Sequence, residues 1–313
     1  MSNERPTMNT QPISVSFNVS DNYVQHLAVV AVSILTNAPN SRFVFHVLTR
    51  EMSEESRLRL RKIEQEYGRC RFEIHVVDFS LFANMPSPLE HVSRDARFRI
   101  ILPNILANDA RTIYLDVDLL VIGDITPLWS VDLGDKMLGG VIDNFDPDQD
   151  LMDYRAELGL SPGSKYVNSG VLVMDLEKLR RFDFPSKCFA TIDRLRDILS
   201  FVDQDTINIV AEGHIQILPE RWNCQNRPRT LDGERPVIRH FTSFTNKPWC
   251  NIWKNRTWPL YLRYLLKSPY RDRAVAFVLG HLKGFFWYRF VKKGIERTIL
   301  LGLTIRKRPA PKK

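Results

Sequence analysis

The sequence predicts an α/β fold in which helices flank a mostly parallel, mixed β-sheet. In the N-terminal third, short apolar runs alternate with longer helix-like segments, an order typical of sheets covered by helices on both faces. Two later apolar runs carry or end on carboxylates, and the ends of strands are where such sheets bind ligands. The chain has 313 residues, of which 44% are hydrophobic, so it can bury a substantial core.

The first part of the chain supplies strands and helices in alternation. Residues 13–19 alternate as a strand does, and the Ser20-Asp21-Asn22 cluster that follows favours a turn and a helix cap. Ser53 is a second cap residue, and the acids after it suit a helix N-terminus. The expected elements are a strand at 13–19, a largely buried helix at 23–35, a strand at 43–48, a polar helix from 53 to about 67 and a strand at 71–77.

The remainder of the chain continues the pattern with longer irregular stretches. Residues 143–164 are polar and rich in turn formers, which predicts a mobile loop with a short helix, and residues 221–255 show no clear periodicity. The expected elements are a helix at 95–106 with a bend at Pro103, a strand at 113–122, a strand at 137–142, a strand at 166–174 interrupted by Asn168-Ser169-Gly170, a helix at 203–211 and a short strand at 215–218.

Charge is distributed unevenly along the chain. Residues 281–313 contain ten Lys or Arg and a single acid, Glu296, whereas the rest of the chain is close to neutral. A nucleic-acid enzyme needs its basic groove on the folded body, so the composition predicts no nucleic-acid partner. Four cysteines without a CxxC pair give no disulfide framework or cysteine zinc site and fit a reducing compartment. We expect a loose extension at 1–11, a folded domain at 12–265 and a basic, aromatic segment at 266–313.

Asp116 and Asp118 lie two residues apart inside an apolar, strand-like run. Alternate strand residues face one side, so the two carboxylates can converge, and a cation between them offsets their repulsion. Hard oxygen ligands suit manganese or magnesium. A calcium loop is excluded because Leu120 and Val121 stand where an acid and a glycine are needed. A solvated strand end carrying two acids remains the alternative.

Other candidate residues stand at the ends of apolar runs. His240 is either a metal ligand or a packed histidine, and Lys247 offers a cation near it. Asp203 and Gln204 open a helix, where an acid is favoured in any case. Neither GxxxxGK(S/T) nor GxGxxG occurs, so a bound diphosphate would be neutralised by a metal and side chains rather than by a glycine-rich loop.

Taken together, these motifs resemble glycosyltransferase family 8, whose members are retaining enzymes that use nucleotide sugars. The resemblance is strongest to bacterial lipopolysaccharide galactosyl- and glucosyltransferases, with glycogenin more distant. It runs from about Ile13 to Trp249. The ordered motifs are FNVSDNY from Phe17, Ala96-Arg97, YLDVDLLV from Tyr114, Pro127-Leu128-Trp129, Ile142-Asp143, VNSGVLV from Val167, Asp203-Gln204-Asp205, His240-Phe241-Thr242 and Lys247-Pro248-Trp249.

The resemblance implies a GT-A type, Rossmann-like nucleotide-sugar-binding domain and a role for each matched residue. Manganese, or magnesium, is expected on Asp116, Asp118 and His240. The UDP-hexose donor is expected to contact a larger set: Val19 and Asn22 at uracil and ribose, Asp116 through the metal, Lys247 at the diphosphate, and Arg97, Asp143, Asn168, Ser169, Asp203 and Gln204 at the sugar. Among these, Gln204, Asp203 and Asp143 are the expected catalytic residues.

The chain departs from the family pattern at two places. Ser20 stands where the first motif usually carries an acid, and Ser243 stands where a glycine is usual, with one extra residue before Lys247. For the reaction we expect transfer of galactose or glucose from UDP with retention, by front-face substitution supported by Gln204, because a neutral amide is a poor nucleophile. The alternatives are a catalytically weak nucleotide-sugar-binding scaffold and a self-glycosylating protein like glycogenin.

The C-terminal segment suggests where the acceptor is found. Residues 274–303 interleave aromatic and basic side chains, a pattern that suits an interfacial helix on anionic lipid, although a helix packed on the body is the alternative. The apolar stretches there are shorter than the roughly 20 residues that span a bilayer. We therefore expect a cytoplasmic protein, peripheral on the inner face of the cytoplasmic membrane, with a saccharide acceptor such as the lipopolysaccharide core.

Overall fold

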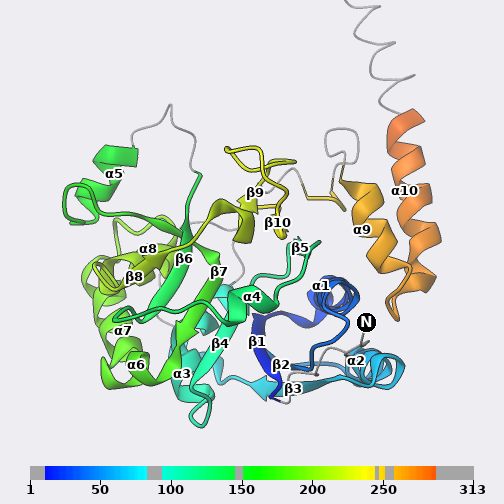
Figure 1. Ribbon diagram of the computed structural model, residues 1–313, viewed down its shortest axis with the longest axis horizontal. Coiled ribbons are helices and arrows are strands. Elements are labelled where there is room, and N and C mark those ends of the chain that lie inside the picture. Colours follow the sequence, from blue (N-terminus) through cyan, green and yellow to red (C-terminus); the bar gives the residue numbers. More distant parts are fainter. Residues whose placement is uncertain (1–10, 83–93, 145–150, 244–246, 251–256, 287–313) are drawn as a thin grey trace, which may run out of the picture.

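The computed structural model describes residues 11–82, 94–144, 151–243, 247–250 and 257–286. Figure 1 shows a central sheet with helices on both faces and the last helix at one side. The main sheet has seven strands in the order β3-β2-β1-β4-β7-β6-β8. These strands are β1 (Ile13–Asn18), β2 (Phe43–Thr49), β3 (Cys70–Val76), β4 (Arg111–Leu115), β6 (Leu138–Ile142), β7 (Val167–Asp175) and β8 (Ile215–Ile217).

Most neighbouring strands of this sheet run parallel. Strand β7 alone runs antiparallel to its two neighbours, β4 and β6. Strands β1 and β4 are parallel, with Ser16 opposite Tyr114, so their carboxyl ends meet at one edge of the sheet. The predicted α/β fold with a mostly parallel, mixed sheet is confirmed.

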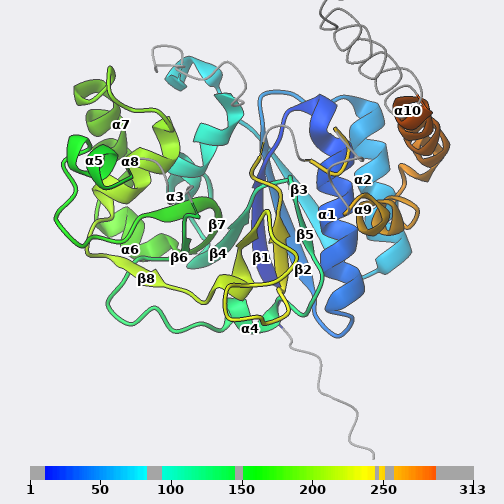
Figure 2. The same cartoon turned by 90° about the horizontal axis from the view of Figure 1, so that it is seen from above.

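Helices cover the two faces of the sheet with separate hydrophobic cores (Figure 2). Alternate residues of β1 and β2 pack on one side, where Val15 and Phe45 are fully buried. The helices on this side are α1 (Val24–Asn37), α2 (Glu54–Tyr67) and α9 (Trp258–Leu265). The helices on the other side are α3 (Leu102–Ile105), α6 (Leu176–Arg181), α7 (Phe184–Arg194) and α8 (Val202–Val210).

Local capping explains where several helices begin and end. Ser53 Oγ accepts a hydrogen bond from the N–H of Ser56 at the start of α2, as the sequence predicts. Gly68 ends α2 with a φ of 64°, which a glycine adopts without strain. Asp175 caps α6 in the same way through the N–H of Lys178. The short α4 (Thr126–Trp129) and α5 (Leu151–Glu157) follow β5 and β6 in the chain.

A second, three-stranded sheet corrects the prediction of one strand over 113–122. The run is divided between β4 and β5 (Leu119–Val121), and β5 pairs with β10 (Ile238–His240), which in turn pairs with β9 (Cys224–Gln225). The apolar residues on both sides of the acids would be buried in one continuous strand as well as in two separate strands, so composition alone did not reveal the break. The Asp116-Val117-Asp118 segment therefore connects two sheets.

Two further elements differ from expectation. Residues 94–101 form a 3₁₀-helix that gives way to α3, and Pro103 lies in the first turn of α3, where its missing N–H breaks no helical bond. The strand expected to be interrupted at 168–170 is continuous, and the irregularity is a register shift in its pairing with β6 between Gly140 and Ile142. Residues 1–10 and 145–150, which belong to the predicted extension and loop, lie outside the described residues.

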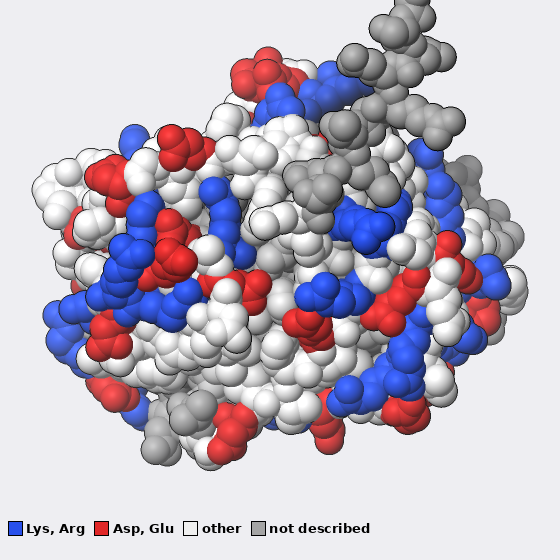
Figure 3. Space-filling model, turned by 60° about the horizontal axis from the view of Figure 1, so that its bottom comes forward, with Lys and Arg blue, Asp and Glu red and all other residues white. Residues whose placement is uncertain are grey.

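The C-terminal part of the described chain packs onto the body through the residues before α10 (Ala274–Phe286) and through Phe277 in the first turn of this helix. Tyr270 and Ala274 belong to the core, and Arg59 of α2 pairs with Asp272 at 2.8 Å. Val275 of α10 is 67% exposed. No helix among the described residues is long and apolar enough to cross a membrane. The face drawn in Figure 3 intermixes acidic and basic side chains. The domain boundary at 265, and the basic segment 287–313 outside the described residues, remain predictions.

Candidate active site

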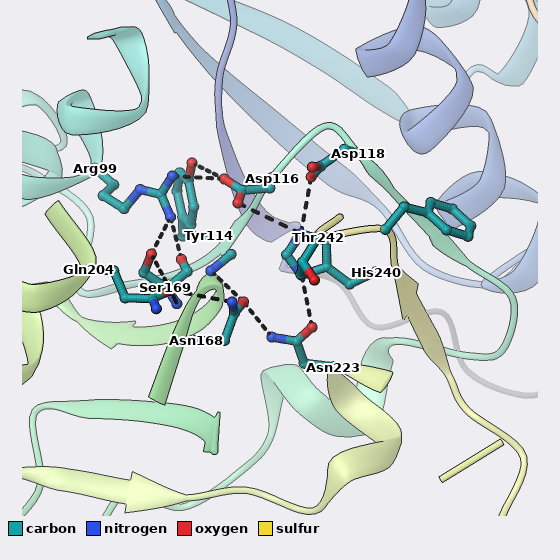
Figure 4. A network of polar contacts seen from close by, with 12 residues as sticks. Arg99, Tyr114, Asp116, Asp118, Asn168, Ser169, Gln204, Asn223, His240 and Thr242 are labelled. Atoms are coloured by element: carbon teal, nitrogen blue, oxygen red, sulfur yellow. Dashed lines mark hydrogen bonds and ion pairs between the residues drawn. The ribbon is translucent and has the colours of Figure 1, made fainter. Parts of the chain in front are cut away.

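Asp116 and Asp118 are held at the junction of the two sheets by backbone hydrogen bonds. The N–H of Asp116 donates to the carbonyl of Gly170 on β7 at 2.8 Å, and the N–H of Phe241 after β10 donates to the carbonyl of Asp118 at 3.0 Å. The antiparallel pairing of β5 with β10 sets His240 opposite Leu119. As a result, one ligand atom from each of Asp116, Asp118 and His240 lies within 4.8 Å of the others (Figure 4).

Gly170 provides the space in which these three side chains meet. A Cβ atom at this position would lie 2.2 Å from His240 Cε1 and 2.6 Å from Asp116 Oδ2. Both distances are shorter than any van der Waals contact, so every other residue type would displace two members of the cluster. The glycine of the predicted motif is thus explained by close packing rather than by an unusual backbone conformation.

A chain of hydrogen bonds orients the His240 ring and places a proton on its Nδ1. The backbone N–H of Gly170 donates to Asn168 Oδ1 at 3.0 Å, which identifies this atom as the amide oxygen. Asn223 Nδ2 donates to the same oxygen at 2.9 Å, so the other end of this amide, Asn223 Oδ1, faces His240 Nδ1. Asn223 Oδ1 accepts a hydrogen bond from the N–H at Nδ1 over 2.9 Å. His240 Nε2 is then the nitrogen that can offer a lone pair to a metal, and it lies 3.0 Å from Asp118 Oδ1 and 3.8 Å from Asp116 Oδ2. Two carboxylates and this lone pair are a donor set that fits a divalent cation.

Arg99 compensates the negative charge on the other side of Asp116. It donates to Asp116 at 2.9 Å and to the Ser169 carbonyl at 2.6 Å, and its Nε lies 3.0 Å from Asp203. Burial opposes the charge of Arg99, but the surrounding anions, Asp116 first among them, outweigh it and raise the pKa of the guanidinium. Tyr114 donates to the same Asp116 oxygen at 2.6 Å. This carboxylate is therefore firmly oriented before any ligand binds.

The sequence singled out Arg97, and the structure adds Arg99, which contacts the carboxylates of Asp116 and Asp203. Arg97 is also buried, at 3% exposure, so burial does not distinguish the two. Both belong to the 3₁₀-helix at 94–101, in which residues two apart point in different directions. We therefore propose a donor-sugar role for Arg99 as well, and the role of Arg97 stays a prediction.

Gln204 is buried between the acidic cluster and Asp143. Its Nε2 donates to Asp143 Oδ2 at 2.7 Å, and its Oε1 accepts from the Ser169 N–H at 2.9 Å. Asn168 Nδ2 donates to the same Asp143 oxygen at 3.1 Å. Burial raises the pKa of Asp143 in spite of these two donors. The structure thus brings together the predicted sugar-binding residues Asp143, Asn168, Ser169, Asp203 and Gln204.

Asp205 anchors the helix that carries Gln204. Its carboxylate is fully buried and accepts hydrogen bonds from the hydroxyl groups of Tyr154 and Tyr166 and from the Phe201 N–H at 2.7 Å. Tyr154 belongs to α5, so this contact ties the segment before β7 to the start of α8. Burial raises the pKa of Asp205 despite the three donors.

Lys247 reaches the cluster although the chain has one more residue before it than the family pattern. Its Nζ donates to Asp118 Oδ2 and, at 2.7 Å, to the carbonyl of Phe241. Burial alone would raise the pKa of Asp118, but the ammonium of Lys247 and the ring of His240 hold it well below its usual range. Residues 244–246, which contain the insertion, lie outside the described residues.

The predicted uracil and ribose contacts lie where β1 ends, at the same edge of the sheet. Val19 is 2% exposed, whereas Asn22 is exposed in the turn that follows. Ser20 stands where the family usually has an acid, and its hydroxyl donates to Asn22 Oδ1 at 2.6 Å and so orients the Asn22 amide. The roles of these residues toward a nucleotide stay predictions.

Four residues that sequence reasoning left out complete the site: Arg99, Tyr114, Asn223 and Asp205. Tyr114 and Asp205 belong to the quoted motifs and were assigned no role. Asn223 lies in the stretch without periodicity, where no pattern distinguished it.

The site and the fold together define a mixed α/β protein in which side chains with metal-ligand chemistry gather at strand ends. Comparisons with known proteins give the family. A sequence model of Glycosyl transferase family 8 matches residues 14–252. The chain belongs to this family, as the resemblance in its motifs predicted, and it is therefore a glycosyltransferase.

Individual relatives match most of the chain. General stress protein A of Bacillus subtilis is 28% identical over 265 residues, which cover 78% of this chain and 90% of that protein. A lipopolysaccharide 1,2-glucosyltransferase of Escherichia coli is 26% identical over 285 residues, covering 86% and 81%. The crystal structure of the galactosyltransferase LgtC in complex with donor and acceptor sugar analogs is 27% identical, with a TM-score of 0.73, covering 82% of this chain and 96% of that one.

Proposed function

We propose that this chain is a retaining hexosyltransferase that takes galactose or glucose from a UDP-sugar, with manganese, and attaches it to a saccharide acceptor. The observation that carries the proposal is the cluster of Asp116, Asp118 and His240, in which the Asn223 amide leaves His240 Nε2 free to bind a metal. These donor atoms fit manganese or magnesium. When bound, such an ion offsets the charge of a diphosphate leaving group.

Lys247 supplies a second positive charge at the same place. In the structure its ammonium is paired with Asp118, the carboxylate shared with His240. A diphosphate oxygen bound beside Asp118 competes with this carboxylate for the Lys247 ammonium and takes over part of the ion pair. The developing charge on the departing UDP is then stabilised by a group already in place.

The donor sugar is expected between the acidic cluster and Gln204. Arg99 and Asp203 form a buried ion pair there, and Asp143 lies beside the Gln204 amide. During transfer the bond between the anomeric carbon and the phosphate oxygen breaks, and the acceptor hydroxyl bonds to the same face. Its proton passes to the departing phosphate. Gln204 has no charge to act as a strong nucleophile, and both of its ends are hydrogen bonded, so we assign it support of the developing cation.

The acceptor is proposed to be a membrane-linked glycan such as a lipopolysaccharide core. The similarity to a lipopolysaccharide glucosyltransferase supports the acceptor class. The ten basic residues between 281 and 313 support attraction to an anionic surface, and the exposed Val275 and Leu279 on α10 add apolar area. These features support a peripheral position on the inner face of the cytoplasmic membrane.

Metal-dependent donor hydrolysis tests the proposal. The purified chain is incubated with UDP-galactose, UDP-glucose or ADP-glucose, with manganese or with a chelator, and released nucleotide is measured. We expect slow release from one UDP-hexose with manganese only, and none from the variant Asp118→Asn. Asp124→Asn is the matched control, because Asp124 is exposed and only orders the start of α4. Release that persists in the chelator contradicts the metal assignment.

The same reactions separate the alternative functions. A scaffold binds UDP-hexose without releasing UDP, even when lipopolysaccharide acceptors are added. A self-glycosylating protein gains the mass of one or more hexoses on incubation with donor. Gln204→Ala is expected to slow transfer without abolishing it, whereas complete loss with unchanged donor binding supports a covalent intermediate.

Membrane attachment is tested separately with vesicles. A chain truncated after residue 286 is expected to lose binding to anionic vesicles and to keep its UDP-hexose hydrolysis, because the described site lies within 14–252. Neutral vesicles are the control for charge. Equal binding of the truncated and full chains to anionic vesicles contradicts the proposal.

A further inference from the structure

Three side chains with metal-ligand chemistry gather on one face of the sheet between β2 and β3. His46 of β2 is in register with Glu73 of β3, and His75 follows Glu73 by two residues, so all three point to the same side. Strand β3 is the edge of the sheet, and β2 and β1 separate it from β4, which leads into the acidic cluster (Figure 1). This second cluster is therefore distinct from the candidate active site.

The spacing of the three groups matches the edges of a small coordination shell. His46 Nδ1 lies 3.1 Å from His75 Nε2 and 3.3 Å from Glu73 Oε2. One ligand atom from each of the three lies within 4.8 Å of the others. Two ligands at the usual distance from a tetrahedral zinc ion are about 3.3 Å apart, so an ion can bridge them with little movement.

The surroundings prepare these groups for a cation. Arg71 Nε binds the other oxygen of Glu73 at 2.7 Å, which orients Oε2 toward His46. A histidine coordinates a metal through an unprotonated ring nitrogen, and both His46 Nδ1 and His75 Nε2 face the centre of the cluster. His46 is 2% exposed, whereas the Glu73 side chain is 37% exposed, so the cluster is closed by protein on one side and open to water on the other.

We propose that His46, Glu73 and His75 bind a zinc-class divalent cation that fastens the edge strand β3 to β2. Two imidazoles and one carboxylate suit zinc, whereas the acidic cluster, with two carboxylates, suits harder ions. Three protein ligands leave a fourth position for water on the exposed side. In the competing arrangement the same side chains are joined only by hydrogen bonds, without an ion.

Zinc titration of the full-length chain tests the site. The acidic cluster is first removed with the double substitution Asp116→Asn and Asp118→Asn, and the metal-stripped protein is titrated with Zn²⁺ by calorimetry and with Co²⁺ by visible absorption. We expect one ion per chain and a tetrahedral cobalt spectrum. Adding His75→Gln is expected to weaken binding by about 100-fold or more, since even outer-shell partners of metal ligands are worth 10- to 100-fold.

Controls keep the test independent of folding and of the proposed activity. His214→Gln changes an exposed histidine elsewhere and is expected to leave zinc binding unchanged. The wild-type chain, with saturating Mn²⁺ and UDP on the acidic cluster, gives the same stoichiometry if the double variant fails to fold. Zinc raises the thermal unfolding midpoint of wild type but not of His75→Gln. If zinc does not bind stoichiometrically, or if His75→Gln leaves the zinc affinity unchanged, the proposed site is wrong and the three side chains are joined by hydrogen bonds alone.

Discussion

Replacing Asn223 with alanine tests how the structure prepares His240 for a metal. Asn223 is not one of the proposed metal ligands. Its Oδ1 accepts a hydrogen bond from His240 Nδ1 at 2.9 Å, and its Nδ2 donates to Asn168 at 2.9 Å. Without it, the His240 N–H is left in a site that is 2% exposed, and the ring loses the contact that selects its tautomer. Loss of such a partner weakens metal binding about 10- to 100-fold, or roughly 1.4–2.7 kcal/mol.

Manganese affinity in the presence of UDP is the appropriate assay, with free Mn²⁺ followed by electron paramagnetic resonance. Asn226→Gly is the matched control: the amide of Asn226 contacts Thr242 instead of the ring, and glycine tolerates its φ of 53°. His240→Ala sets the scale for complete loss of the ligand. If Asn223→Ala binds manganese as tightly as wild type while His240→Ala does not, the tautomer argument is refuted.

Three further predictions follow from the contacts around the cluster. Gly170→Ala is expected to reduce manganese affinity at least as far as His240→Ala, because its Cβ overlaps His240 and Asp116; unchanged affinity by the same resonance assay contradicts this. Lys247→Met is expected to lower kcat for UDP-hexose hydrolysis by about 100- to 1,000-fold, the range for removing one charge-stabilising donor, whereas a change in KM alone would assign it to ground-state binding. Because burial raises the pKa of Asp143, its ionised form lowers stability as pH rises through that pKa. Asp143→Asn should therefore unfold at a higher temperature than wild type at pH 8 but not at pH 3.5, with reduced transferase activity. If the variant and wild type have the same unfolding midpoint at pH 8 as well as at pH 3.5, the prediction is wrong.

The fold was accessible from the sequence because its signals are local. The alternation of apolar strand-like segments with helix-like segments, and the Ser53 cap, indicated the class of sheet directly. The strand predicted at 113–122 was wrong because its two halves are equally apolar and pair with different sheets. Which sheet a strand joins depends on distant partners such as β10, and periodicity carries no information about them.

The candidate site was predictable to the extent that its residues stand in short motifs. Asp116, Asp118 and His240 do come together, although the acids converge through a bend between sheets rather than along a strand. The role predicted for Arg97 at the donor sugar stays a prediction, whereas the motif gave no role to Arg99, which contacts Asp116 and Asp203. Asn223 has no signal in one sequence, because its role depends on a hydrogen bond to a residue 17 positions away.

Anomalous diffraction from crystals grown with Mn²⁺ and UDP shows directly whether Asp116, Asp118 and His240 hold the metal. We expect a single manganese peak bonded to Asp116, Asp118 and His240 Nε2, with the UDP diphosphate completing its coordination and Lys247 moved from Asp118 toward a phosphate oxygen. A peak elsewhere, or UDP bound without manganese while Lys247 stays paired with Asp118, would contradict it.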